Sequence, residues 1–151
     1  MPESEPRVLI VENNDALRVM LFTILRHQPL AVDTAANADE AIDKVTTCDY
    51  ALILIDIDLP DGDGPRFLRR FRAERPEATT FVIAVRDPLQ NEAIDAEIVS
   101  AILNKPIEID TFADVVRECA IVVPPPDDPL PCQPAESETH GKLERGWYLP
   151  N

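Results

Sequence analysis

Acidic and amide side chains stand at two points of this chain, each directly after a short apolar run. Glu12 and Asn13 follow one run, Asp56 follows a second, and Lys105 comes after a third. Short apolar runs are typical of buried strands in a parallel sheet, whose carboxyl ends meet at one edge where ligands bind. Carboxylate and amide oxygens suit a hard cation such as Mg²⁺, and a lysine suits phosphate oxygens. An aspartate in such a cluster can act as a nucleophile and form an acyl phosphate.

Strand and helix patterns alternate around these side chains. Apolar runs predict five strands, at residues 7–11, 30–34, 51–56, 80–85 and 100–104. Apolar residues at helical spacing predict four helices. The first ends before Pro29, the second spans residues 38–46, the third begins near Pro65 and the fourth begins near residue 110. This alternation implies an α/β fold, a doubly wound five-stranded parallel sheet with helices on both faces. Residues 87–99 hold four acidic and no basic residues, so we expect at most a short, poorly anchored helix there.

Length, charge and cysteine content exclude several classes of function. The 151 residues suit one domain plus an extension, and a net charge of -14 argues against binding to nucleic acid or an anionic membrane surface. No stretch approaches the roughly 20 apolar residues of a membrane span, and the acidic start of the chain is unlike a signal peptide. Cys48, Cys119 and Cys132 are odd in number and lack metal-ligand spacing, which predicts reduced thiols in a cytoplasmic protein.

The chain changes character at Pro124. Five of the residues from 124 to 131 are prolines, and such a run holds neither helix nor sheet. We therefore divide the chain into a domain at residues 1–123 and a Pro-rich, extended and mobile tail at residues 124–151 that is dispensable for folding. Trp147 is the only tryptophan. We expect it to be a tail residue without a site, and a small docking peptide is the alternative.

Three segments of the chain resemble the receiver domain of two-component response regulators. They are Val-Leu-Ile-Val-Glu-Asn-Asn at 8–14, Leu-Ile-Asp-Ile-Asp-Leu-Pro-Asp-Gly-Asp-Gly at 54–64, and Asn-Lys-Pro at 104–106. They occur in the order of the family and the resemblance covers residues 7 to about 120. It implies the flavodoxin-like receiver fold, with five parallel strands and five helices. It also implies Mg²⁺-dependent transfer of a phosphoryl group from a histidine kinase to an aspartate.

The resemblance assigns roles position by position. Asp56 matches the phospho-acceptor, which is also a metal ligand, and the backbone carbonyl of Asp58 would join it on the metal. Glu12 matches an acidic position that usually acts on the metal through water. Lys105 matches the lysine that contacts the phosphoryl group, and the bond between Lys105 and Pro106 is expected to be cis, as in the family.

Three positions depart from the family pattern. Asn13 replaces an aspartate that usually binds the metal directly, so we expect Mg²⁺ to bind weakly at Glu12, Asn13 and Asp56. Arg86 stands where the family has Thr or Ser, and Ile102 stands where a switch aromatic is usual. Neither half of the usual hydroxyl–aromatic switch is therefore present. Arg86 is either an ordinary surface arginine or a side chain that folds back onto Asp56 or Glu12.

The leading interpretation is a single-domain response regulator that accepts a phosphoryl group on Asp56 and signals by contacts with proteins. Expected partners are a histidine kinase or phosphotransfer protein and a protein output partner, with a second copy of the chain as a further candidate. We expect no nucleic acid, no membrane, and no enzyme activity beyond self-catalysed phosphotransfer and dephosphorylation. The alternative is a pseudo-receiver, a binding module that acts without phosphorylation. A hydrolase of small phosphorylated substrates would need an additional acid or base after the third strand, and a cap insertion.

Overall fold

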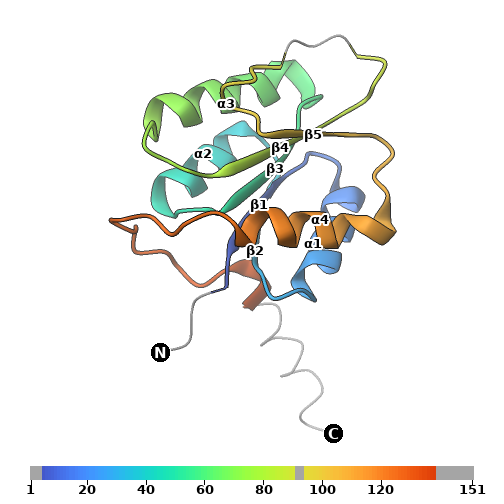
Figure 1. Cartoon of the computed structure of the whole chain (residues 1–151). Coiled ribbons are helices and arrows are strands. Elements are labelled where there is room, and N and C mark those ends of the chain that lie inside the picture. Colours follow the sequence, from blue (N-terminus) through green and yellow to red (C-terminus); the bar gives the residue numbers. More distant parts are fainter. Residues whose placement is uncertain (1–4, 91–93, 139–151) are drawn as a thin grey trace, which may run out of the picture.

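The computed structural model describes residues 5–90 and 94–138, and their core is a five-stranded parallel sheet (Figure 1). The strand order is β2-β1-β3-β4-β5. The strands are β1 (Arg7–Val11), β2 (Ala31–Ala35), β3 (Leu52–Asp56), β4 (Phe81–Arg86) and β5 (Ala101–Asn104). The helices are α1 (Asp15–Arg26), α2 (Ala38–Thr47), α3 (Asp63–Glu74) and α4 (Ile109–Ile121), with a short 3-10 turn at Pro60–Gly62 before α3. The fold class predicted from the sequence is confirmed.

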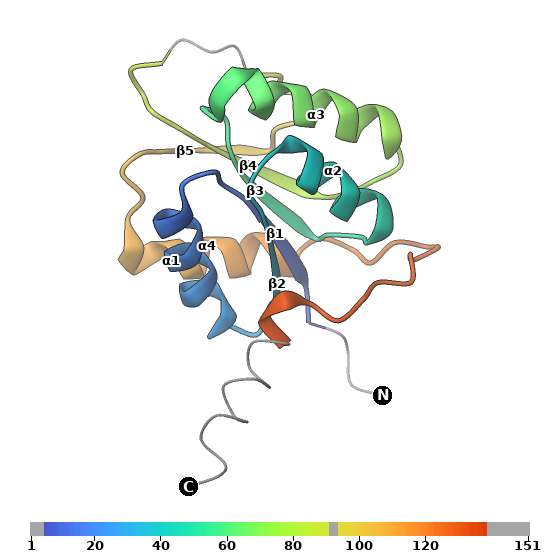
Figure 2. The same ribbon diagram turned by 180° about the vertical axis from the view of Figure 1, so that it is seen from behind.

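Helices cover both faces of the sheet (Figures 1 and 2). α2 and α3 pack on one face, and α1 and α4 pack on the other. β3 lies in the middle of the sheet and every one of its residues is buried. This position explains its unbroken apolar run, since alternate side chains enter the two cores.

The connection between β4 and β5 contains no helix in its described parts, residues 87–90 and 94–100. The family pattern implies five helices, whereas the described residues hold four α-helices. The sequence allowed at most a short, poorly anchored helix in this segment, and its described parts hold none. Val99 is buried, and Ile94 and Ile98 pack against the core beside α2 and α3, so these apolar side chains anchor the connection.

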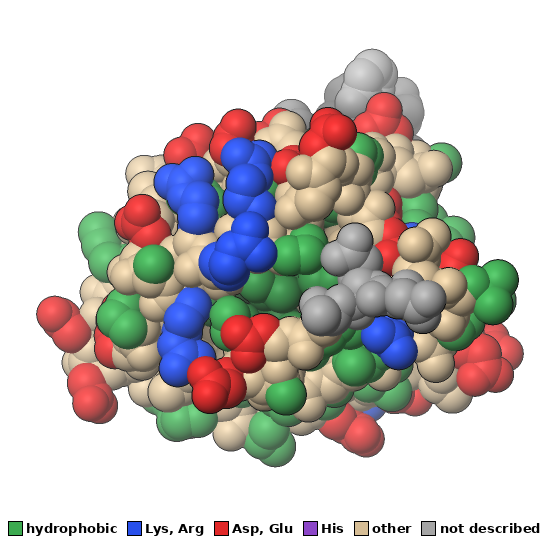
Figure 3. All heavy atoms as spheres, turned by 90° about the horizontal axis from the view of Figure 1, so that it is seen from above, with side chains coloured by type: hydrophobic (Ala, Val, Ile, Leu, Met, Phe, Trp, Pro, Cys, Tyr) green, Lys and Arg blue, Asp and Glu red, His purple; other side chains and the backbone are tan. Residues whose placement is uncertain are grey.

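Arginines line the outer side of α3. Figure 3 shows Lys and Arg side chains gathered on the face of the molecule that carries α3. Arg66, Arg69, Arg70 and Arg72 are exposed there. Arg75, just after the helix, instead ties its end to the body of the protein, because its guanidinium donates to the Val45 carbonyl at 2.8 Å and to Asp49 at 2.6 Å.

Residues 130–138, which we call the strap, lie against the β2 edge of the sheet (Figure 2). A disulfide joins Cys132 of the strap to Cys48 at the end of α2. The prediction of three reduced thiols is therefore wrong for these two cysteines, and Cys119 alone is free among the described cysteines. The signal was missed because 84 residues separate the two cysteines in the sequence. The interpretation of Trp147 concerns a residue outside the described part of the chain.

The strap differs from the mobile, dispensable tail expected from the prolines. Ala135 is buried, and the described tail makes hydrogen bonds to Arg7, Val32 and Asp49 in addition to the disulfide. The proline run keeps this segment extended, and the extended chain reaches back across the molecule to β2. The division of the chain at residue 123 remains a prediction.

We expect a chain that ends at Val123 to be less stable than the full chain under oxidising conditions. It loses the disulfide and the strap contacts, and a lost disulfide of this kind typically costs about 2–4 kcal/mol of unfolding free energy. Urea denaturation of both chains measures the difference, and a reducing agent should shrink it. Equal stability in oxidising buffer would restore the view that this segment is dispensable for folding.

Candidate functional site

The carboxyl edge of the sheet brings together the side chains that the sequence singled out. Glu12 follows β1, Asp56 ends β3, and Lys105 follows β5. Glu12 and Asp56 are buried, with 4% and 5% of their surface exposed. A buried carboxylate is costly unless it is paired or hydrogen-bonded, so the partners of these two groups decide what the site can do.

Two donors hold the carboxylate of Asp56. The Lys105 ammonium donates to Asp56 Oδ2 at 2.9 Å, and the backbone N–H of Asp58 donates to Asp56 Oδ1 at 2.9 Å. Lys105 Nζ also lies 3.8 Å from Asp58 Oδ2. Burial acts to lower the pKa of Lys105, but the hydrogen bond and charge of Asp56, with the charges of Glu12 and Asp58, outweigh it and raise that pKa. The lysine therefore stays charged beside Asp56.

Glu12 is fixed from both sides. Its Oε2 accepts from the backbone N–H of Asn14 at 3.0 Å, and its own N–H donates to the Ala35 carbonyl at the end of β2. Asn14 then caps α1, because its side chain accepts from the N–H of Leu17. Burial is the largest influence on Glu12 and raises its pKa, and the nearby carboxyl of Asp56 raises it further. The two carboxyl groups are therefore close enough to repel each other.

The start of α3 lies very close to the backbone of the loop after β3. A Cβ placed on Gly64 would lie 2.7 Å from the carbonyl oxygen of Ile57, so only glycine lets α3 start against this loop. The loop turns through Asp61 and Gly62, both at positive φ. It thereby places the Asp58 backbone beside Asp56. The Lys105–Pro106 bond is cis, as the resemblance implied.

The two switch positions, Arg86 and Ile102, lie in different environments. Arg86 ends β4 and pairs in register with Asn104, one residue before Lys105. Its Nε is buried without a hydrogen-bond partner among the described residues, and within that part of the chain its guanidinium makes no ion pair. The structure therefore does not show Arg86 paired with Asp56 or Glu12. Ile102 lies on β5 with 45% of its surface exposed.

The donor set of this edge fits a hard divalent cation. Glu12 and Asp56 offer carboxylate oxygens, Asn13 is exposed next to Glu12, and Asp58 Oδ1 is buried without a hydrogen-bond partner in the described residues. Within residues 5–90 and 94–138, His, Cys, Asp and Glu side chains form no group of three or more with the arrangement of a metal centre. A cation here would consequently depend on an amide or backbone oxygen as well as on carboxylates.

The fold and site define a doubly wound α/β protein with a buried aspartate–lysine pair at its carboxyl edge. The family model described as the response regulator receiver domain matches residues 8–117, so the chain belongs to that family. Receiver domains are signalling modules of two-component systems, generally without enzyme activity. They typically carry a phosphorylated aspartate, bind Mg²⁺, and interact with histidine kinases and output partners.

Individual relatives agree with this assignment. The transcriptional regulatory protein PmrA of Pectobacterium parmentieri is 32% identical over 85 residues, which are 56% of this chain and 38% of PmrA. A CheY-like receiver domain from Methylobacillus flagellatus is 26% identical, with a TM-score of 0.67 over 77% of this chain and 99% of that one. TrrA of Thermotoga maritima, solved with Mg²⁺-BeF, shares the fold at 22% identity, with a TM-score of 0.64 over 76% and 98% of the chains. The chain spans between 26% and 49% of the length of eight of the curated relatives it matches.

The sequence did not reveal the structural roles of two side chains near the site. Arg18 of α1 donates to the carbonyl of Glu12 at 2.9 Å and so fixes the segment that follows β1. The carboxylate of Asp58 accepts from the N–H of Asp87 at 2.7 Å, which ties the loop after β3 to the loop after β4. The acidic residue at position 58 was visible in the sequence, but only its backbone was considered.

We expect Asn13→Asp to tighten Mg²⁺ binding. The change restores a negative charge beside Glu12, and one additional charge near the cation should lower the Kd on the order of tenfold. Isothermal titration calorimetry of both proteins measures the Kd, with Asn14→Asp as a neighbouring charge control. An unchanged Kd in Asn13→Asp would remove position 13 from the metal site.

Proposed function

We propose that this receiver domain accepts a phosphoryl group on Asp56 and signals through contacts with proteins. The observation that carries the proposal is the Asp56–Lys105 pair, in which a buried carboxylate is held 2.9 Å from an ammonium at the carboxyl edge of the sheet. One oxygen of Asp56 is positioned by a backbone N–H, and the other faces a cation that suits phosphate oxygens. A buried ion pair contributes little to stability by itself. The position of this pair, at the edge where open α/β sheets bind ligands, therefore supports a role in binding or chemistry.

In the proposed step, an oxygen of the Asp56 carboxylate attacks phosphorus and forms an O–P bond. The bond between phosphorus and its donor breaks, which is the N–P bond of a phosphohistidine or the O–P bond of acetyl phosphate. The leaving group departs with that electron pair. Lys105 then contacts a phosphoryl oxygen in place of the carboxylate, so its positive charge stabilises the negative charge that now lies on the phosphoryl oxygens.

A divalent cation in this site would neutralise charge on the phosphoryl oxygens and the carboxylates. Glu12, Asn13, Asp56 and the backbone carbonyl of Asp58 are the residues we propose to hold it. The amide at Asn13 contributes no charge, and we therefore propose weak Mg²⁺ binding. The buried carboxyls of Glu12 and Asp56 repel each other, so the protein itself gains from a cation between them.

We expect acetyl phosphate with Mg²⁺ to add one phosphoryl group to the chain. Intact-mass spectrometry should show an adduct of about 80 Da, the mass of PO₃H, that disappears in Asp56→Asn because the amide is not a comparable nucleophile. Asp58→Asn is the matched control, since it removes a nearby carboxylate and keeps the proposed acceptor. An adduct that persists in Asp56→Asn would place the phosphoryl group elsewhere.

The second candidate function is a pseudo-receiver that binds partners without phosphorylation. The departures at Asn13, Arg86 and Ile102 favour it, and so does the connection from β4 to β5, which lacks a helix in its described parts. The same mass measurement separates the two functions. A wild-type chain that takes no phosphoryl group from acetyl phosphate at saturating Mg²⁺ would support the pseudo-receiver.

We further propose that Arg86 replaces the usual hydroxyl of the family switch. The guanidinium of Arg86 has no ion-pair partner among the described residues. The backbone carbonyl of Arg86 accepts from the N–H of Lys105 at 2.9 Å, so Arg86 lies next to the lysine that pairs with Asp56. A guanidinium can hold two phosphoryl oxygens at once. Ile102, already exposed, has no ring to rotate inward.

We expect Arg86→Met to weaken binding of the phosphoryl mimic beryllofluoride in the presence of Mg²⁺. Loss of a charge-assisted hydrogen bond of about 1.5–3 kcal/mol corresponds to a roughly tenfold or larger rise in Kd. Calorimetry measures the Kd, and Arg86→Lys should be intermediate because a lysine cannot bind two oxygens in parallel. Equal affinities for all three proteins would show that Arg86 does not touch the phosphoryl group.

The proposal also covers the location of the protein in the cell and the partners that it binds. No helix in the described part of the chain is long and apolar enough to cross a membrane. We propose a cytoplasmic receiver that takes its phosphoryl group from a histidine kinase or a phosphotransfer protein, as its family does, and passes the signal to a protein partner.

A further inference from the structure

The strap, residues 130–138, occupies the outer edge of β2. β2 is the first strand in the sheet order, so alternate backbone N–H groups on its outer side have no neighbouring strand. The strap supplies partners for two of them. Ser137 Oγ accepts from the N–H of Val32 at 2.9 Å, and Glu136 Oε1 accepts from the N–H of Thr34 at 3.2 Å.

A buried carboxylate anchors the strap. Asp33 of β2 has 3% of its surface exposed and is satisfied by three residues. Arg7 lies 2.7 Å from Oδ2, the hydroxyl of Tyr50 donates to the same oxygen at 2.6 Å, and the N–H of Glu136 donates to Oδ1 at 2.8 Å. Burial chiefly, and then the charge of Asp33, raise the pKa of Tyr50, so its hydroxyl keeps the proton that it donates. One of the donors to this buried charge therefore belongs to the strap.

Apart from the buried side chain of Ala135, the remaining contacts of the strap are polar and mostly near the surface. Lys44 pairs with Glu136, and Thr34 donates its hydroxyl to the same carboxylate at 2.9 Å. Arg7 donates to the Gln133 carbonyl at 2.5 Å, and the N–H of Leu130 donates to Asp49 at 2.7 Å. Ion pairs and hydrogen bonds in such positions contribute little each, so the covalent bond between Cys48 and Cys132 is the one strong constraint on the strap that reduction would remove.

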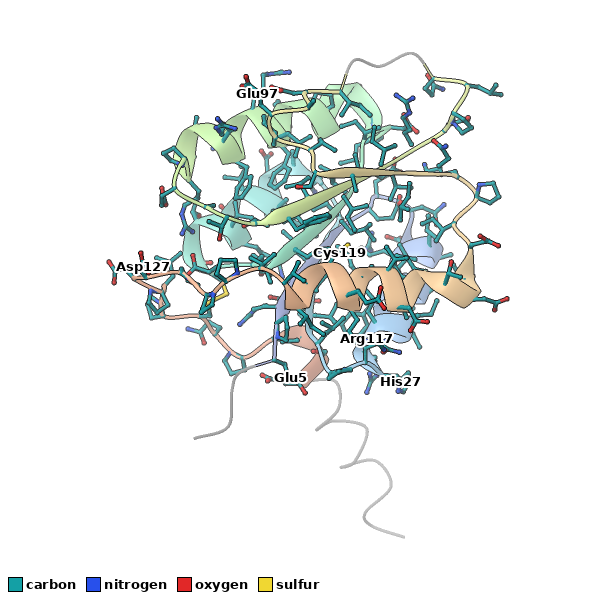
Figure 4. The ribbon with its side chains drawn as sticks, viewed as in Figure 1. Glu5, His27, Glu97, Arg117, Cys119 and Asp127 are labelled. Carbon is teal, nitrogen blue, oxygen red and sulfur yellow. A yellow bond between two sulfur atoms is a disulfide. The ribbon has the colours of Figure 1, made fainter. Side chains whose placement is uncertain are left out.

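The two sulfurs of that bond differ in access. Cys132 is exposed, whereas Cys48 is buried with 4% of its surface exposed. Cys119 comes from α4 and is the free cysteine of the described residues (Figure 4). An attacking thiolate therefore reaches the sulfur of Cys132 first, and Cys48 is the leaving group.

We propose that Cys48–Cys132 is a thiol-exchange site whose redox state decides whether the strap covers the β2 edge. The thiolate of a dithiol attacks Cys132 Sγ, the protein S–S bond breaks, and Cys48 leaves and takes up a proton. The second thiol of the dithiol gives up its proton and attacks the dithiol sulfur of the mixed disulfide. The bond from that sulfur to Cys132 Sγ breaks, the dithiol departs as a cyclic disulfide, and the Cys132 thiolate takes up a proton. Two electrons pass from the dithiol to the protein, which gains two thiols.

This site gives the receiver a second input that does not depend on phosphorylation of Asp56. Cytoplasmic thiols are kept reduced, and disulfides that form there are usually transient and redox-sensing. In the oxidised chain, Val32 and Thr34 are covered. In the reduced chain, the strap is a tethered segment without its covalent bond, and the outer edge of β2 becomes accessible.

Hydrogen exchange of the full chain tests the proposal. Dithiothreitol should raise the titrated thiols from one to three and speed exchange at the amides of Val32 and Thr34 on the order of tenfold. The amide of Ala31 is an internal reference, because its N–H donates to the Pro6 carbonyl at 2.9 Å and not to the strap. Cys132→Ser without reductant should exchange like the reduced wild type, and Cys119→Ser should exchange like the oxidised wild type.

Two results would overturn the proposal. Three titratable thiols in air-oxidised protein would show that the disulfide does not form. Unchanged exchange at Val32 and Thr34 after complete reduction would show that the strap holds the edge without it, and this outcome is readable from the wild type even if Cys132→Ser fails to fold.

Discussion

The burial of two carboxylates, Glu12 and Asp56, beside the ammonium of Lys105 at one edge of the sheet is the constraint on which the rest of this structure depends. Three parallel strands end there, and the segments after them bring Glu12, Asp56 and Asp58 around a single ammonium, that of Lys105. Burial is the largest cause of the raised pKa of Glu12; the hydrogen bond from the Asn14 N–H opposes it, and the charge of Asp56 adds to it. An edge with this surplus of negative charge is stabilised by a nearby cation, which supports the proposal that it holds a metal ion.

Much of the surrounding backbone keeps that edge in place. Gly64 lets α3 begin against the Ile57 carbonyl, and the N–H of Ile57 donates to the Val85 carbonyl of β4. The N–H of Lys105 donates to Arg86, which joins the segment after β5 to the end of β4. Backbone hydrogen bonds between neighbouring segments thus position Glu12, the loop after β3 and Lys105 relative to one another.

The sheet could be predicted from the sequence because its strands are local patterns, and the same patterns placed the candidate site residues at the ends of those strands. The unbroken run before Asp56 indicated a strand buried on both faces, and Asp56 and Lys105 stand at the ends of such runs, whereas the cis bond before Pro106 was implied by the family resemblance. The strap could not be read, because its contacts depend on residues far away in the chain. Asp33 looked like one polar residue in a short strand, and only the fold shows that it is buried against Arg7 and Tyr50. The disulfide was missed for the same reason, since spacing in the sequence says nothing about two cysteines 84 residues apart. The burial of Arg86 Nε also depends on packing that the sequence alone does not specify.

The central claim is that Asp56 is the phospho-acceptor of a site that reorganises around a phosphoryl group. The most direct test is the amide NMR spectrum of the chain with Mg²⁺ and with Mg²⁺ plus beryllofluoride. The account predicts that beryllofluoride shifts the amides that border the site, at Ile57, Asp58, Asp87 and Lys105, and that Asp56→Asn abolishes these shifts. A spectrum that beryllofluoride leaves unchanged at these four amides, at saturating Mg²⁺, would contradict it.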